Sequence, residues 1–253
     1  MGSTLFYLGG STKAVQHAAE ILQSQGIAFT DDLEAEITDL LLDIPSFQKD
    51  LILRSGEPLS SVLGKLSPSL RIWGGKLRAV SSTYQTVDLL ENPRYPAENG
   101  AITADCAIRL AGPKLQKCWG DCRVLVIGWG RIGKNLCRML KRLGSSVTVC
   151  ARKEPDRALL AAFGYQVLKP EDLRGDDFDL IFNTAPAPMM TEAQIGICPL
   201  AIDLAGCQGL QGKQVLSARG LPGIWAPETS GKLIARTILE QLGGGSGWIS
   251  VLP

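Results

Sequence analysis

One segment constrains the fold of this chain more than any other, and it runs from Val124 to Cys150. The apolar run Val124–Ile127 leads into a glycine-rich turn and then a helical pattern that Gly144 ends. A second apolar run, Val147–Cys150, begins about fourteen residues after the last glycine of the turn. The turn itself reads Gly128-Trp129-Gly130-Arg131-Ile132-Gly133. Strand, turn, helix and strand in this order predict a parallel βαβ unit that carries a dinucleotide-binding fingerprint.

The three glycines of this turn have separate expected roles. Gly128 allows the tight turn, Gly130 lets the backbone approach a pyrophosphate, and Gly133 lets the helix pack closely on the strand. The start of the helix adds free N–H groups and a partial positive charge. We predict that the cofactor-binding turn consists of Gly128, Trp129, Gly130, Arg131, Ile132 and Gly133. The alternative is a glycine-rich turn that binds nothing.

The end of the second strand bears on the choice of cofactor. An NAD site usually has an acidic side chain there, which holds the ribose 2′-hydroxyl. Here Cys150 is followed by Ala151, Arg152 and Lys153, with no acid among them. Arg152 offers a planar fork and Lys153 a point charge for a 2′-phosphate, so the sequence favours NADP over NAD. A solvated basic turn is the alternative.

The remaining pattern extends this unit into a doubly wound Rossmann sheet. Further strands are expected at residues 166–168, 179–182, 200–204 and, more weakly, 213–216. The last helix is expected from Ser230 to Leu242, with Thr229 or Ser230 as its cap. Residues 243–253 begin with a run of glycines and serine, which predicts a flexible tail.

The N-terminal third predicts a smaller, open, flavodoxin-like α/β domain. Strands are expected at 5–8, 27–29, 40–44, 51–53 and 71–73, and helices at 12–25 and 83–90. Residues 91–96 contain two prolines, which predict an extended crossing. A helix at 101–115, interrupted near Pro113, follows. We therefore divide the chain into a substrate or cap domain (1–95), a nucleotide-binding domain that starts with a linker helix (96–242), and a tail (243–253), with the hinge between Asn92 and Gly120.

Composition excludes several kinds of function. The chain of 253 residues has one histidine, His17, so histidine-based nucleophilic, zinc or proton-shuttle sites would depend on that residue. Lys and Arg total 26 against 25 Asp and Glu, which gives no argument for a nucleic acid or membrane partner. The seven cysteines include one close pair, Cys118 and Cys122, whose spacing does not suit zinc, so we expect no metal site. With no apparent secretory signal, reduced thiols indicate a cytoplasmic protein.

Ligands of open α/β sheets bind beyond the carboxyl ends of the strands. Three such ends carry unusual residues: 182–186, 203–206 and the loop 219–231. The nicotinamide half of a cofactor is expected at the first of them. The cofactor residues predicted there are Asn183, Thr184, Ala185 and Pro186.

At these positions the sequence resembles the family of the dipicolinate synthase A subunit, over about Leu89 to Leu242. The resemblance rests on Gly-Trp-Gly-Arg-Ile-Gly, on Asn-Thr-Ala-Pro (183–186), on Ile-Asp-Leu-Ala (202–205) and above all on Gly-Leu-Pro-Gly-Ile-Trp-Ala-Pro-Glu-Thr-Ser-Gly (220–231). Residues 96–101, Pro-Ala-Glu-Asn-Gly-Ala, are similar to the family's Pro-Thr-Ala-Glu-Gly segment. The N-terminal domain is short for the family, and residues 206–209 depart from its Pro-Gly-Gly continuation.

This resemblance implies an NADP-dependent oxidoreductase that oxidises dihydrodipicolinate to dipicolinate during spore formation. It also implies that the partner is a flavoprotein-like B subunit, and we expect a homo-oligomer that binds a small dicarboxylate. The product ring is aromatic, so positioning matters more than a strong base. Expected proton acceptors are Glu98, Asp203 and Glu228. The expected substrate-binding residues are Arg219, Pro222, Gly223, Thr229, Ser230 and Lys232, of which Arg219, Thr229, Ser230 and Lys232 would anchor the carboxylates. For each acid a structural hydrogen-bonding role is the alternative, and Lys232 could equally be solvated.

Two other functions stay open. One is a dehydrogenase of a 2-hydroxy acid or another small carboxylate, although such enzymes usually rely on a histidine and acid pair that the C-terminal domain lacks. The other is a non-catalytic nucleotide-binding or assembly subunit, which the departure at 206–209 and the short N-terminal domain motivate.

Overall fold

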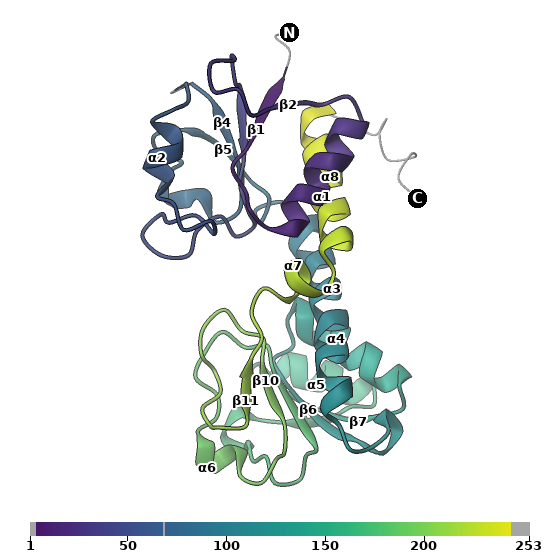
Figure 1. The fold of residues 1–253 in the computed structure, drawn as a ribbon. Helices are drawn as coiled ribbons and strands as arrows, with labels where there is room; N and C mark the ends of the chain where they lie inside the picture. The colour runs from purple at the N-terminus through teal and green to yellow at the C-terminus, as the bar shows by residue number, and fades with distance from the viewer. Residues whose placement is uncertain (1–3, 68, 244–253) are drawn as a thin grey trace. The chain divides into compact units, whose positions relative to one another are not determined.

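The computed structural model describes residues 4–67 and 69–243 (Figure 1). The chain forms two compact units. The first unit consists of residues 1–99 and the segment from Pro222, and the second unit consists of Gly100–Leu221. Each unit has a parallel sheet with helices packed on it, which confirms the predicted α/β class. Of the tail predicted at 243–253, Gly243 is the last residue of a helix, and residues 244–253 lie outside the described residues.

The second unit contains a six-stranded parallel sheet in the order β11-β10-β9-β6-β7-β8. Its strands are β6 (Arg123–Ile127), β7 (Ser146–Cys150), β8 (Gln166–Leu168), β9 (Leu180–Asn183), β10 (Ala201–Asp203) and β11 (Val215–Ser217). Numbered from β6, this is the doubly wound order 3-2-1-4-5-6 read from its far edge. The predicted Rossmann sheet, including its weak sixth strand, is confirmed.

The fold of the second unit follows from its buried strands and amphipathic helices. The apolar residues of β6 and β9 are wholly buried, as expected for central parallel strands covered on both faces. Three helices connect the strands: α4 (Arg131–Arg142), α5 (Glu154–Ala162) and α6 (Glu192–Ile195). In α4, Leu136, Cys137 and Leu140 face the core at helical spacing, while Lys141 and Arg142 occupy the last turn, where their charge favours the helix dipole.

The first unit contains a five-stranded parallel sheet in the order β2-β1-β3-β4-β5. Its strands are β1 (Leu5–Leu8), β2 (Ala28–Thr30), β3 (Asp39–Leu41), β4 (Arg71–Gly74) and β5 (Gln85–Asp88). This is the flavodoxin-like order 2-1-3-4-5, as the sequence predicted. Its helices are α1 (Lys13–Ser24), α2 (Leu59–Leu63) and α8 (Pro227–Gly243), while α3 (Arg94–Ala111) and α7 (Leu221–Trp225) cross the unit boundaries.

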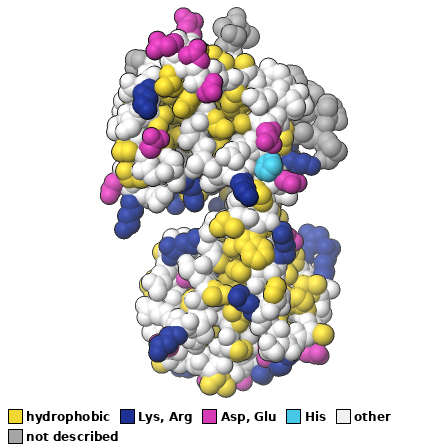
Figure 2. All heavy atoms as spheres, viewed as in Figure 1, with side chains coloured by type: hydrophobic (Ala, Val, Ile, Leu, Met, Phe, Trp, Pro, Cys, Tyr) yellow, Lys and Arg dark blue, Asp and Glu magenta, His cyan; other side chains and the backbone are white. Residues whose placement is uncertain are grey.

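Helix α8 packs on α1, although about two hundred residues of sequence separate them (Figure 1). Gly231 permits the close approach, because a Cβ atom there would lie 2.7 Å from the Cβ of His17 and 2.8 Å from the backbone oxygen of Ala14. His17 also pairs with Glu20 at 3.1 Å and is about one-third exposed. Figure 2 shows the histidine at the surface beside acidic side chains. His17 is therefore an ordinary helix residue.

Three local predictions in the first unit were wrong. Residues 83–90 do not form a helix but include β5, which pairs with β4 and suits the β-branched Thr86 and Val87. Residues 51–53 form only isolated bridges. The crossing at 91–96 is partly helical, since α3 begins at Arg94 and places Pro96 in its first turn, where a missing N–H costs no helical hydrogen bond.

The predicted start of the last helix was also wrong. Helix α8 begins at Pro227, a residue favoured at the first helical position, and the Ser230 amide already donates to the Ala226 oxygen at 2.9 Å. Thr229 and Ser230 therefore lie inside the helix and do not cap it. The interruption of the linker helix at Pro113 is confirmed, because α3 ends at Ala111 and a short 3₁₀ turn follows.

The structure draws the domain boundaries differently from the sequence. Contacts group the segment from Pro222 with residues 1–99, whereas the sequence division kept residues up to 242 with the nucleotide-binding domain. The reason is the packing of α8 on α1, which no local pattern reveals. Among the described residues, no helix has the length and apolarity needed to cross a membrane.

Candidate functional site

The fingerprint turn (residues 128–133) lies at the carboxyl end of β6, the strand at which the order of the sheet reverses. Gly128 has a φ of 101°, and a Cβ atom there would lie 2.6 Å from the Thr184 hydroxyl oxygen. A Cβ atom on Gly133 would lie only 2.1 Å from the Gly128 oxygen. Both positions thus require glycine for reasons internal to the second unit.

Gly130 differs from the other two glycines of the fingerprint turn. It precedes α4 with a φ of −86°, which any residue can adopt, and a Cβ atom there would meet no atom within 4 Å. The free space at Gly130 and the amides at the start of α4 fit a bound pyrophosphate. The turn therefore has the shape that a dinucleotide requires.

The other members of the fingerprint turn are placed differently. The Trp129 ring meets Tyr165 edge-on at 5.9 Å, and Lys134 lies 5.7 Å from its centre. Its indole nitrogen is buried without a hydrogen-bond partner among the described residues. Arg131 is exposed and Ile132 is half-buried. Trp129 thus anchors the turn against its own unit by ring contacts.

The β7 turn, residues 151–153, follows the end of β7. Ala151 is buried, while Arg152 and Lys153 are exposed, so both cations are available to an anion. Lys153 immediately precedes α5. Sequence reasoning missed Arg157, whose guanidinium donates to the backbone oxygens of Ala151 and Arg152. In the sequence, the cluster of three basic residues within 152–157 was the one signal that could have indicated a role for Arg157.

At the end of β9, Asn183 and Thr184 hold the backbone of the neighbouring turns. The Asn183 side chain donates to the Asp203 carboxylate at 2.8 Å and accepts from the Ala185 amide at 3.0 Å. The Thr184 hydroxyl donates to the Ile127 oxygen at 2.9 Å. Pro186 is exposed and Ala185 half-exposed. The sheet thus brings all four residues to the edge that carries the fingerprint turn.

Asp203 is buried at the end of β10 and is surrounded by donors. Its carboxylate accepts from the amides of Gly209 at 2.7 Å, Leu210 at 3.2 Å and Ala205 at 3.3 Å, and from the Asn183 side chain. These bonds tie the family-divergent loop 206–209 to the sheet. Both oxygens of the Asp203 carboxylate are therefore engaged in holding the loop.

A cavity of about 360 Å³ opens beside Asp203 and is lined in part by Gln208, Ser217 and Arg219. Arg219 is exposed and donates through Nε to the Ala205 oxygen at 3.1 Å. The predicted anchor Arg219 and the divergent loop therefore share one cavity in the second unit.

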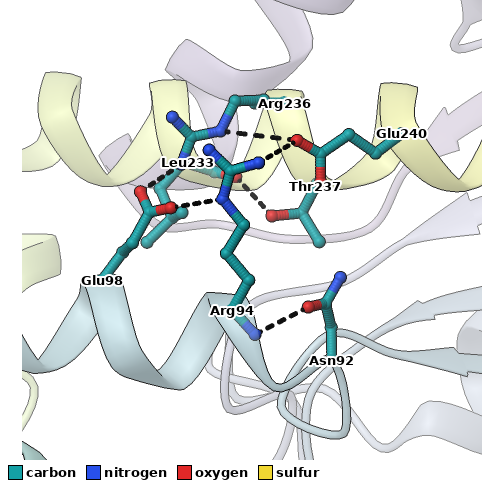
Figure 3. Close-up of polar contacts among 7 residues, drawn as sticks. All are labelled: Asn92, Arg94, Glu98, Leu233, Arg236, Thr237 and Glu240. Carbon is teal, nitrogen blue, oxygen red and sulfur yellow. Dashed lines mark hydrogen bonds and ion pairs between the residues drawn. The ribbon is translucent and has the colours of Figure 1, made fainter. Parts of the chain in front are cut away.

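The remaining predicted residues lie in the first unit, and Glu98 is the best defined (Figure 3). Its carboxylate pairs with Arg94 at 2.6 Å and with Arg236 of α8, while Arg94 also bonds Glu240 at 2.8 Å. Partial burial raises the pKa of the Glu98 carboxyl, but hydrogen bonds and charge from Arg94 and Arg236 outweigh burial, so that the pKa lies below its ordinary value. This pairing makes Glu98 a weak proton acceptor.

Helices α7 and α8 carry the other residues of the C-terminal motif (Gly220–Gly231). Glu228 and Thr229 are exposed in the first turn of α8, and Lys232 is exposed one turn further on. The Ser230 hydroxyl is buried without a hydrogen-bond partner in the described part of the chain. Pro222 and Gly223 lie in α7, buried and half-buried.

No group of three or more potential metal ligands occurs in the ranges that the structure describes. All seven cysteines are free, and the buried Cys137 and Cys150 have pKa values that burial raises to about 12 and about 11. Burial thus disfavours the reactive thiolate form of these two side chains.

Comparison with known proteins agrees with this geometry. The A subunit of dipicolinate synthase from Bacillus subtilis (strain 168) is 29% identical over 177 residues, which cover 65% of this chain and 60% of that protein. The chain is homologous to that protein. The matched segment thus spans about three-fifths of the relative's length. No family model matches the chain.

Solved structures extend the likeness to both units. The crystal structure of the Bacillus halodurans A subunit of dipicolinate synthase superposes with a TM-score of 0.82 at 22% identity, covering 95% of this chain and 98% of that one. The transhydrogenase from Sinorhizobium meliloti matches with a TM-score of 0.67 at 11% identity, covering 95% and 93%. At these identities the structures establish the shared fold alone, two α/β units of which one has a Rossmann-like sheet.

Proposed function

We propose that this protein is an NADP-dependent oxidoreductase that oxidises a dihydrodipicolinate-like dicarboxylate to an aromatic product. The observation that carries the proposal is the fingerprint turn, in which Gly128 and Gly133 are constrained by the fold while Gly130 leaves free space. Homology to the dipicolinate synthase A subunit supports the substrate class. A role in spore formation, a cytoplasmic location and self-association are part of the same proposal.

The chain's own residues would bind the cofactor in two places. The amides at the start of α4 would hold the pyrophosphate, and Arg152 and Lys153 would hold the 2′-phosphate. When bound, NADP⁺ would take up the hydride that leaves the substrate ring. The side chains of Asn183 and Thr184 keep the backbone between β6, β9 and β10 in place, since each is committed to bonds within that edge.

Substrate carboxylates would be bound by cations and hydroxyl groups. Arg219 is the strongest candidate, because it is exposed, lines the cavity beside Asp203 and is oriented by its Nε bond to the Ala205 oxygen. Thr229, Lys232 and the backbone near Pro222 and Gly223 are weaker candidates. The second hydrogen of the substrate leaves as a proton. Of the three acids, we propose Glu228 as acceptor, since it is exposed, while Glu98 and Asp203 are engaged in their own bonds.

The decisive experiment is Gly130→Ala. Alanine is allowed at this φ and meets no atom, so the free energy of unfolding should change by less than about 0.5 kcal/mol. If a pyrophosphate occupies the space, NADPH affinity should fall at least tenfold, measured by fluorescence titration. Unchanged NADPH affinity would reject this site.

Turnover is followed at 340 nm with NADP and an enzymatic dihydrodipicolinate-forming mixture. We expect NADPH formation, and its dependence on an added B subunit tests the proposed partnership with a flavoprotein-like chain. Tight NADPH binding without turnover of any dicarboxylate would favour the second candidate, a nucleotide-binding or assembly subunit. That candidate draws its support from the divergent loop 206–209, which Asp203 fixes beside the cavity.

A further inference from the structure

Arg157 is a charged residue whose contacts the proposed function does not use. It lies in the first turn of α5, and its Nη1 atom donates to the Ala151 oxygen at 3.1 Å and the Arg152 oxygen at 2.6 Å. One guanidinium nitrogen thus bonds two successive carbonyl groups of the β7 turn. The Arg157 amide also bonds the Lys153 oxygen at 3.2 Å, so helix and turn are tied together twice.

These contacts change the electrostatics of the β7 turn. Carbonyl oxygens are the negative ends of peptide dipoles, and two of them left free would oppose a phosphate nearby. The guanidinium covers both. Its charge reaches the strand end as well, because burial and Glu171 raise the pKa of the Cys150 thiol while Arg157 acts in the opposite direction.

The positive charge of Arg157 matters because acidic side chains offset the other basic residues of the β7 turn and the start of α5. Within residues 152–157, three basic side chains stand against two acidic ones, Glu154 and Asp156, both in the first turn of α5. Without Arg157 the segment would have no net charge. Glu171 and Asp172, in the 3₁₀ turn after β8, add further negative charge near Cys150.

We propose that Arg157 is the positioning residue that makes the β7 turn selective for a dinucleotide with a 2′-phosphate. It holds the Ala151 and Arg152 carbonyls and thereby fixes the backbone that presents the Arg152 and Lys153 side chains. A lysine at this position would keep the charge, but its strongly hydrated ammonium on a flexible stem would hold the two carbonyl groups less firmly than the rigid guanidinium. The inference rests on the proposed function, since it concerns the same cofactor site.

The test measures NADPH, NADH and 2′,5′-ADP affinities for the wild-type protein and for Arg157→Met and Arg157→Lys, with thermal melting of each. Arg138→Met, at an exposed arginine of α4, is the matched control for loss of one charge. We expect Arg157→Met to weaken NADPH and 2′,5′-ADP at least tenfold and NADH less than threefold, with Arg157→Lys intermediate. Arg138→Met should change each affinity less than twofold.

The outcomes separate this inference from the proposed function. Equal weakening of NADPH and NADH in the Arg157 variants, or a change in melting alone, would overturn the positioning role while the site itself stands. A wild-type protein that binds no dinucleotide would overturn the proposed function, and this inference with it, before any variant is made. Should Arg157→Met fail to fold, Arg157→Lys decides: an NADPH-to-NADH affinity ratio within twofold of wild type overturns the inference.

Discussion

Gly133 and Gly231 both lie near the start of a helix and both prevent a collision, but with different partners. A Cβ atom on Gly133 would strike the Gly128 oxygen, five residues away in its own turn. A Cβ atom on Gly231 would strike His17 and Ala14 on another helix. Gly133 is thus constrained by a residue of its own turn, whereas Gly231 of the C-terminal motif is constrained by packing against a distant helix. A glycine in a recognisable motif therefore need not mark a ligand.

The largest expected effect is that of Gly133→Ala. A contact of 2.1 Å with a backbone oxygen cannot be relieved by a side-chain rotation, so we expect a loss of about 3 kcal/mol or more in the free energy of unfolding. All seven cysteines belong to the second unit, so thiol labelling during denaturant unfolding reports on that unit alone. Labelling midpoints equal to those of the wild type would contradict the local constraint.

Gly231→Ala should cost about 1–3 kcal/mol, because helices α1 and α8 can shift by a few tenths of an ångström. The loss of stability is expected in the first unit, which contains both helices. Circular dichroism should therefore show unfolding at a lower denaturant concentration than in the wild type. The denaturant midpoint of cysteine labelling and the NADPH affinity should both stay within twofold of wild type. A large loss of NADPH affinity would show that the C-terminal motif serves the cofactor directly.

Asp203→Asn sharpens the comparison within the second unit. An amide can accept at one atom only, so one of the Gly209 or Asn183 donors loses its partner at a cost of about 1–3 kcal/mol. We expect KM for the dicarboxylate to rise more than kcat falls, since the loop 206–209 loosens. A fall of kcat by several hundredfold with unchanged KM would instead make Asp203 the proton acceptor.

The smallest expected effect concerns the ion pairs of Glu98. Its folded pKa is lowered, so it stabilises the protein above its unfolded pKa of about 4.3, and this contribution disappears as the pH falls through the folded pKa. Because the side chain is 38% exposed, Glu98→Gln should cost only about 0.5–1 kcal/mol at pH 7. Urea midpoints measured from pH 7 to pH 3 should converge for the two proteins. A difference in urea midpoint that stays constant across that pH range would show that the ion pairs of Glu98 contribute nothing to stability.

The sequence by itself determined the parts of the molecule that depend on neighbours in the chain. The βαβ segment, the parallel strands of the second unit and the glycine-rich turn follow from apolar runs and from residues a few positions apart. The absence of an acid among residues 151–153 is likewise a local feature of the sequence. It leads to the prediction that the site prefers a cofactor with a 2′-phosphate.

Only the tertiary structure decided which distant residues share a task. It paired α8 with α1, brought Arg236 to Glu98, and brought the Asn183 side chain of β9 to the Asp203 carboxylate. Residues 85–88 form a strand because β4 offers them a partner, although the pattern of residues 83–90 suits a helix. Burial and charge pairing between remote segments leave no periodic pattern in a sequence. The sequence could therefore identify Glu98 and Asp203 as candidates, but it could not show which partners they have.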